Sequence, residues 1–203
     1  MASNKAAHDP YLISPDQPVL RNLIGVNTYE ELSQAESDLY HARVVQLKDH
    51  SLVAPTRDEQ ELRGLHRHLF QDVYDWAGEY RIIDMRLGDG EHFAPCDSIP
   101  LLMRNFMTTL AEQDFLMGLN RAVFVDQLSR FYDELNFIHP FREGNGRTQR
   151  TFWARVAFSA GWILNWAPIH GEELNEASRF AREDRNFSRL NQALDKCVSP
   201  LEG

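Results

Sequence analysis

The chain has 203 residues, of which 43% are hydrophobic and 25% are charged, an ordinary balance for a soluble globular protein. This length suits one well-packed domain, and no run reaches the ~20 apolar residues that cross a bilayer. The formal net charge of −9 argues against nucleic acid as the main partner, because binding to its backbone needs clustered Lys and Arg.

Two features of the sequence predict a cytoplasmic protein. Residues 1–9 are polar and lack the apolar core of a secretory signal peptide. Cys96 and Cys197 are isolated, with neither CxxC nor metal-ligand spacing. We interpret them as two inert thiols in a reducing compartment, and we expect no membrane partner.

The first three predicted helices begin at capping residues. Thr28 with Glu31 and Thr56 with Glu59 are capping boxes, and Asp97 is a candidate cap for the third helix. Apolar residues follow each start at helical spacing. The predicted buried faces are Leu32, Ala35, Leu39 and Ala42; Leu62, Leu65, Leu69 and Val73; Ile99, Met103, Phe106 and Leu110.

Two more helices flank a short loop in the second half of the chain. The fourth helix is expected to end at His139, because Pro140 disfavours helix in the residue before it. The fifth begins near Arg147 and ends at Gly161, and residues 172–198 predict one or two shorter helices. The predicted buried faces are Phe124, Leu128, Phe131, Leu135 and Ile138; Phe152, Val156 and Ala160.

Residues 81–94 break the helical pattern. Ile83, Met85 and Leu87 alternate with polar residues, as in a strand. The turn residues 88–90 follow, and the chain can return as a second strand that contains Phe93. The open edge of such a hairpin can pair with another chain's backbone. The alternative is a structural hairpin folded over the core.

The loop between the fourth and fifth helices combines several groups that bind anions. Residues 144–146 are Gly-Asn-Gly, which lets successive N–H groups turn toward one point at a helix N-terminus. Arg147 and Arg150 lie three residues apart, so both guanidinium groups fall on one face of the first helical turn. These features predict a phosphate clamp.

A proton-transfer group and a metal ligand lie in the same loop. Glu143 supplies a hard carboxylate oxygen of the kind that holds Mg²⁺ together with a substrate polyphosphate. His139 has a pKa suited to proton transfer near neutrality. Each feature alone is commonly a turn, a cap or a solvated side chain, but together they predict a nucleoside-polyphosphate site beside a base. No GKS or GKT follows, and no strand precedes the loop, so Walker and dinucleotide motifs are excluded.

Residues 139–150 resemble the Fic signature H-x-F-x-[D/E]-G-N-G-R-x-x-R. The matches to its fixed positions are His139, Phe141, Glu143, Gly144, Asn145, Gly146, Arg147 and Arg150. Residues 75–81 resemble the segment that leads into the hairpin called the flap in that family. Residues 9–11 and 20–22 resemble the N-terminal arm of bacterial Fic toxins.

The resemblance implies a mainly α fold, a helical bundle with a central helix–loop–helix and one β-hairpin flap. The expected extent is a single Fic domain over residues 1–203. Within it, we expect an N-terminal arm at about 1–26, the flap at about 81–94, the active-site loop at 139–150 and C-terminal helices at about 172–198.

The resemblance also implies a protein adenylyltransferase, which moves AMP from ATP-Mg²⁺ to a hydroxyl of a target protein. The implied roles are His139 as the base, Glu143 as the Mg²⁺ ligand, Gly144, Asn145, Gly146, Arg147 and Arg150 as phosphate ligands, Phe141 as the anchor of the loop, and Ile83, Met85, Leu87 and Phe93 as target-docking residues of the flap. A related Doc type carries Lys where this chain has Gly146 and transfers the γ-phosphate, so Gly146 favours nucleotidyl transfer.

Many Fic proteins carry an inhibitory helix with the pattern [S/T]-x-x-x-E-[G/N], which this sequence lacks. The nearest approach is Thr108 to Glu112, but Gln113 follows. The chain therefore resembles the subgroup of toxins whose inhibitor is a separate small antitoxin, with type II topoisomerase ATPase subunits as targets. The alternatives are an effector that modifies host GTPases, for which 203 residues leave no delivery domain, and a catalytically silent Fic-fold binding module, which the intact His139 and Glu143 disfavour.

Overall fold

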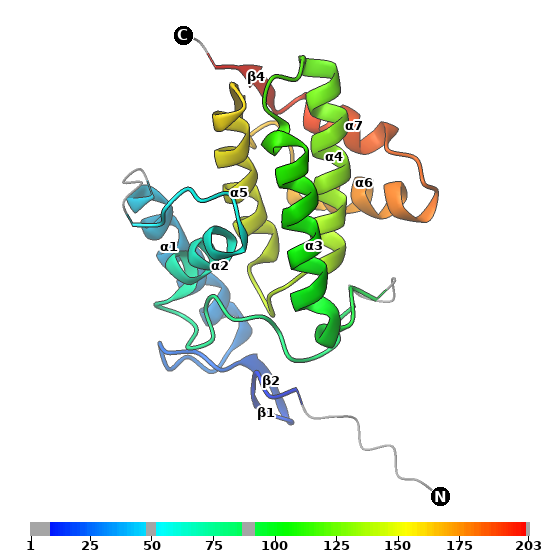
Figure 1. Cartoon of the computed structure of the whole chain (residues 1–203). Helices are drawn as coiled ribbons and strands as arrows, with labels where there is room; N and C mark the ends of the chain where they lie inside the picture. The colour runs from blue at the N-terminus through cyan, green and yellow to red at the C-terminus, as the bar shows by residue number, and fades with distance from the viewer. Residues whose placement is uncertain (1–8, 48–51, 87–91, 202–203) are drawn as a thin grey trace, which may run out of the picture.

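Helices form most of the structure, a computed structural model that describes residues 9–47, 52–86 and 92–201. The helices are α1 (Tyr29–Gln46), α2 (Glu59–Phe70), α3 (Ile99–Glu112), α4 (Arg121–Ile138), α5 (Asn145–Ser159), α6 (Gly171–Glu183) and α7 (Ser188–Asp195). In Figure 1, α3, α4 and α5 stand side by side, with α1 and α2 on one flank and α6 and α7 against α4. The predicted helical fold is confirmed. No helix in the described part of the chain has the length and apolar character needed to span a bilayer.

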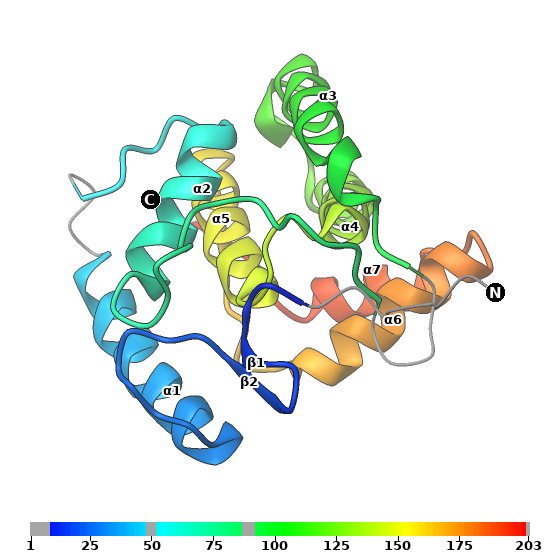
Figure 2. The same ribbon diagram turned by 90° about the horizontal axis from the view of Figure 1, so that it is seen from below.

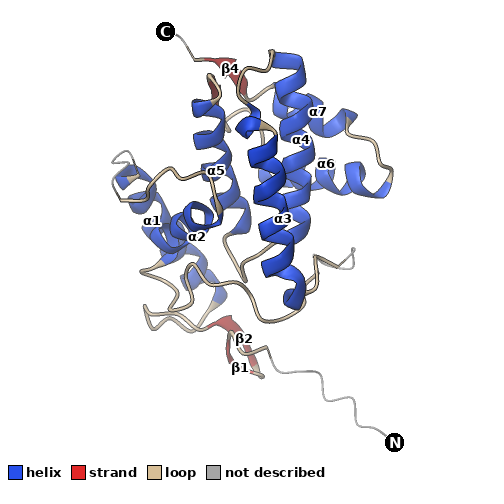
Figure 3. Ribbon diagram, viewed as in Figure 1, coloured by secondary structure: helices blue, strands red, loops and turns tan. Residues whose placement is uncertain are grey.

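Two small antiparallel sheets lie at opposite ends of the bundle (Figure 3). Near the N-terminus, β1 (Leu12–Ser14) pairs with β2 (Gln17–Leu20), with Leu12 opposite Leu20. Near the C-terminus, β3 (Trp162–Leu164) pairs with β4 (Val198–Pro200), with Leu164 opposite Val198. Neither sheet was predicted from the sequence, because strands of three or four residues give too short an alternation to detect.

The predicted apolar faces of α2, α3 and α4 are buried in one core, and so are Phe152 and Val156 of α5. The prediction for α1 was partly wrong. Leu32 is buried, but Ala42 is exposed, and the second buried residue of this helix is Glu36. The reason is that α1 lies at the edge of the bundle and packs mainly on α2, so it contributes a narrow contact face.

The predicted start of the first helix is confirmed, and the starts of the next two were wrong. Thr28 caps α1 by accepting from the Glu31 N–H at 3.3 Å. In α2 the cap is Asp58, which accepts from the Glu61 N–H at 3.0 Å. A helix begun at Thr56 is excluded because Arg57 has φ +59°.

The third helix, α3, follows a 3₁₀ turn, Cys96–Ser98, that contains Asp97. Asp97 therefore lies inside the turn and does not cap α3, whose N-cap position is Ser98.

The predicted flap has one isolated bridge in the described residues, between Arg86 and His92, and the Phe93 N–H donates to the Met85 carbonyl at 3.0 Å. Leu87 and the turn at 88–90 lie outside the described residues.

Candidate active site

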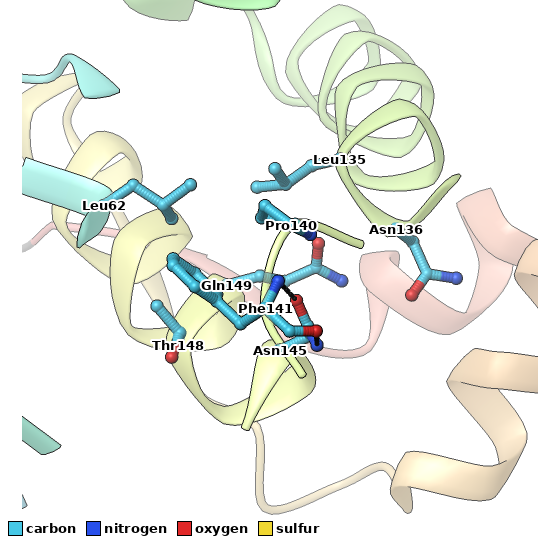
Figure 4. Close-up of a pocket in the computed structure, with 8 residues that line it drawn as sticks. All are labelled: Leu62, Leu135, Asn136, Pro140, Phe141, Asn145, Thr148 and Gln149. Carbon is cyan, nitrogen blue, oxygen red and sulfur yellow. Dashed lines mark hydrogen bonds between the residues drawn. The ribbon is translucent and has the colours of Figure 1, made fainter. Parts of the chain in front are cut away.

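The loop between α4 and α5 is held in place from behind by aromatic and amide groups. Phe141 is buried, and its ring stacks on His66 with centroids 3.9 Å apart. The Asn145 side chain accepts from the Phe141 N–H at 2.8 Å and donates to the Phe141 carbonyl at 2.7 Å (Figure 4). A cavity of only about 10 Å³ remains behind the loop, no more than one water needs. The loop is therefore a rigid element.

His66 fixes the loop from α2. Its Nδ1 accepts from the Gly78 N–H at 2.7 Å, so Nε2 carries the hydrogen and donates to the Glu143 carbonyl at 2.9 Å. Burial lowers the pKa of His66 to about 3, so the ring stays neutral at physiological pH. His66 thus joins the loop to the segment that leads into the flap.

His139 ends α4 in the left-handed conformation, with φ +46°. Such a conformation is unfavourable for a residue with a side chain, and strain of this kind is typical of functional positions. Nδ1 lies 3.3 Å from the Asn136 carbonyl oxygen. Because a carbonyl can only accept, Nδ1 must carry the hydrogen, and Nε2 keeps its lone pair.

The environment of His139 also keeps its ring neutral. Burial, together with the positive charges of Arg81 and Arg182, lowers the pKa of His139 to about 3. The ring of Phe93 covers one face of the imidazole, with centroids 3.7 Å apart and planes 8° from parallel. The expectation of a pKa near neutrality was therefore wrong, because burial disfavours the charged ring; His139 is a neutral base in a fixed orientation.

Arg81 connects the base of the flap to the end of α4. Its guanidinium group is buried and donates to four backbone carbonyls, those of His139 at 2.8 Å, Ile83 at 2.6 Å, Ala94 at 2.5 Å and Ile138 at 3.2 Å. The Arg81 N–H donates to the Pro140 carbonyl at 2.8 Å. The last carbonyls of a helix favour a positive charge, so the Arg81 guanidinium group is stabilised at the end of α4.

At the other end of the loop, α5 begins at Asn145, two residues earlier than predicted. Gly144 has φ +79° and makes the turn, whereas Asn145 and Gly146 are already helical. The predicted nest over residues 144–146 is therefore the first turn of a helix, whose free N–H groups still favour an anion. The side chain of Asn145 is committed to Phe141, so only its backbone N–H can face a phosphate.

Glu143 and Arg147 lie together at this helix start. The Glu143 carboxylate accepts from the Gly144 N–H at 2.8 Å and lies 3.3 Å from Nη2 of Arg147. The Glu143 side chain is 44% exposed. In the described residues, no three His, Cys, Asp or Glu side chains gather to hold a metal ion by themselves.

A cavity of about 630 Å³ opens in front of the first turn of α5. Gly144, Gly146, Arg147 and Arg150 line it from the loop and α5, and β1, β2 and α1 line the opposite side. Figure 2 shows the β1–β2 hairpin beside the start of α5. Arg150 has no ion pair within the described ranges. The cavity thus offers an uncompensated guanidinium group beside a helix N-terminus.

The N-terminal arm contacts the loop through an ion pair. Arg142 donates to Asp9 at 2.8 Å, and both side chains are largely buried. Asp9 is the first residue that the structure describes.

The described docking residues of the flap differ in how deeply they are buried. Ile83 and Met85 are half-buried, whereas Phe93 is buried against His139. Phe93 thus contacts the candidate base directly.

His66, Arg81 and Glu36 were not predicted as site residues from the sequence. Each lies far from the loop in sequence. Glu36 and His66 lie on the inward faces of α1 and α2, and Arg81 begins the segment with strand-like alternation. Only the unusual burial of these polar side chains identifies them.

The chain is similar to known proteins both in sequence and in structure. The model of the Fic/DOC family matches residues 56–157. The chain is 36% identical to "Probable protein adenylyltransferase Fic" of Escherichia coli (strain K12), over 94% of this chain and 92% of that protein. It is 33% identical to "Protein adenylyltransferase VbhT" of Bartonella schoenbuchensis, over 88% of this chain and 37% of that protein.

Solved structures show the same fold. BepC of Bartonella tribocorum, with bound AMPPNP, superposes with a TM-score of 0.87 at 23% identity, covering 95% of this chain and 97% of that one. The effector BepA superposes with a TM-score of 0.83 at 29% identity, covering 94% of this chain and 68% of that one. The chain therefore belongs to the Fic/DOC family and is an enzyme of the protein adenylyltransferase class.

Proposed function

We propose that this enzyme transfers AMP from ATP, bound at the first turn of α5, to a hydroxyl side chain of a target protein. The observation that carries the proposal is the neutral His139 at one end of a rigid loop whose other end is an anion-binding helix start. The target hydroxyl oxygen attacks the α-phosphorus and forms the new P–O bond. Nε2 of His139 takes its proton, and the bond to the β-phosphate breaks to release pyrophosphate.

The phosphates would be held by the N–H groups at the start of α5 and by Arg147 and Arg150. Gly146 leaves room for the α-phosphate, since even a Cβ atom there would have only Nη1 of Arg150 nearby, at 3.7 Å. A lysine side chain would fill that space, which is why we propose transfer of AMP and not of the γ-phosphate.

Glu143 fits the role of a Mg²⁺ ligand. Its carboxylate is partly exposed and lies beside the phosphate site. A single protein carboxylate together with substrate phosphates is the usual way in which Mg²⁺ is held. The bound ion would neutralise charge that develops on the phosphates.

The test is incubation of the purified chain with ATP labelled at the α-phosphate, Mg²⁺ and a bacterial lysate. We expect a labelled protein band, and we expect His139→Ala to abolish it while Mg²⁺-ATP still binds. A general base contributes on the order of 10²–10⁴-fold to the rate. Labelling by His139→Ala at the wild-type rate would refute the mechanism.

We further propose that the enzyme is a cytoplasmic toxin, inhibited by a small helical antitoxin and directed at type II topoisomerase ATPase subunits. The supporting observation is that Arg150 faces the cavity without a carboxylate partner in the described residues. A partner that supplies a glutamate there would block the γ-phosphate.

The toxin proposal is tested by expression in bacteria without a partner. Growth should stop, and toxicity should require His139. Deletion of any helix of this chain should not raise the affinity for ATP. A gain in affinity after such a deletion would mean that the inhibitor lies within the chain.

A further inference from the structure

Glu36 is a buried carboxylate on α1 that neither the motif nor the loop accounts for. It is 8% exposed and lies one helical turn after Leu32, on the face of α1 that points into the molecule. It accepts hydrogen bonds from the hydroxyl of Tyr74 and from Nη2 of Arg147. Because a buried charge without partners is costly, these two bonds fix the position of the carboxylate.

Arg147 is enclosed on several sides. Its guanidinium carbon lies 4.7 Å from the ring centre of Phe70 and 5.3 Å from that of Tyr40. Nη2 contacts both Glu36 and Glu143. Burial opposes the charge of the guanidinium, but the two carboxylates more than offset this, and the pKa of Arg147 is raised.

The carboxylates of Glu36 and Glu143 differ in how far they can move. The Glu36 side chain is 10% exposed and is tied to Tyr74, whereas the Glu143 side chain is 44% exposed and faces the cavity. When Glu143 turns toward a metal ion, as the proposed function requires, Glu36 is the carboxylate that stays on Arg147.

We propose that Glu36 is a positioning residue for nucleotide binding, which holds Arg147 at the edge of the phosphate site from α1. The inference rests on the proposed function, because it assumes that Arg147 binds phosphate. A fixed guanidinium loses less freedom on binding than a mobile one does, so the Glu36–Tyr74 pair raises the affinity for polyphosphate. Both Glu36 and Tyr74 line the cavity with Arg147.

The test is the affinity of the purified chain for Mg²⁺-ATP, measured by calorimetry. Glu36→Gln should weaken binding by about tenfold, the lower end of the loss seen when a group that orients a metal-binding side chain is removed. Tyr74→Phe should also weaken ATP binding, but by less than Glu36→Gln does. If Glu36→Gln does not fold, Tyr74→Phe provides the test instead.

Glu61→Gln is the matched control. Glu61 is a buried carboxylate on α2 that pairs with Arg155, another arginine of α5, at 3.0 Å, two helical turns beyond Arg147. This variant should lower thermal stability and leave the affinity for Mg²⁺-ATP unchanged.

A double-mutant cycle with Arg147→Ala separates positioning from general damage. If Glu36 acts through Arg147, Glu36→Gln should have no further effect on ATP affinity in the Arg147→Ala chain. Unchanged or tighter ATP binding by Glu36→Gln, or an equal loss in both backgrounds, would overturn the inference. If the wild-type chain itself does not bind Mg²⁺-ATP, the proposed function fails instead.

Discussion

Phe93 and His139 stack face to face, so a residue of the flap covers the ring of the candidate base. The aromatic ring limits rotation of the imidazole about its side-chain bonds, and the hydrogen bond from Nδ1 to Asn136 fixes its plane. The orientation of Nε2 is thus set partly by the flap and partly by α4.

Phe93→Leu should therefore lower the rate of AMP transfer without changing the affinity for ATP. An aromatic pair of this kind contributes about 0.5–1.5 kcal/mol, which corresponds to about a tenfold loss of rate at most. Transfer is measured with α-labelled ATP, and binding by calorimetry. The control is Phe106→Leu, a buried position on α3, which should reduce stability and leave the rate per folded molecule unchanged.

The pH dependence of transfer should reflect the lowered pKa of His139. A histidine of ordinary pKa would lose most of its neutral form as the pH falls from 8 to 5. With its pKa at about 3, His139 stays neutral throughout that range, so its contribution to the rate should be constant. Initial rates measured across this range on a chain shown to remain folded test the expectation. A decline centred near pH 6.5 would contradict it.

Arg81→Lys should reduce both stability and transfer. A lysine cannot donate to four carbonyls at once in the planar arrangement of a guanidinium group. Each buried carbonyl left without a donor costs about 1–3 kcal/mol. Because the lost bonds reach Ile83 and Ala94 as well as His139, transfer should fall by more than ATP affinity does.

The comparison for Arg81→Lys is Arg155→Lys, which weakens the buried ion pair with Glu61, remote from the loop. It should lower the melting temperature without a selective loss of transfer. If the ratio of lost transfer to lost ATP affinity is the same in Arg81→Lys as in Arg155→Lys, Arg81 has only a structural role.

Gly144→Ala should prevent the loop from forming. A Cβ atom there would lie 2.4 Å from the Phe70 ring, and φ is +79°. The strain of the backbone alone costs about 1–2 kcal/mol, and the clash adds to it. Gly146→Ala is the control, because Gly146 is helical and has room for a Cβ atom. Denaturant unfolding should show a large loss of unfolding free energy for Gly144→Ala and none for Gly146→Ala. Equal stabilities of the two variants would contradict this account of the loop.

The sequence by itself located most of the helices and predicted the chemistry of one loop. Helical periodicity located the buried faces of α2, α3 and α4, because burial on one side of a helix repeats every 3.6 residues. Pro140 marked the end of α4. Residues 139–150 predicted the base and the phosphate site, because those groups lie next to one another in the chain.

Tertiary structure alone decided which side chains hold those groups in place. Glu36, His66 and Arg81 come from α1, α2 and the approach to the flap, and they reach the loop only after the helices pack. Helical periodicity can place Glu36 and His66 on an inward face, but it does not show which distant group each polar side chain will meet. Long-range packing also sets the neutral state of His139, because its pKa depends on burial and on Arg81 and Arg182, which are distant in sequence.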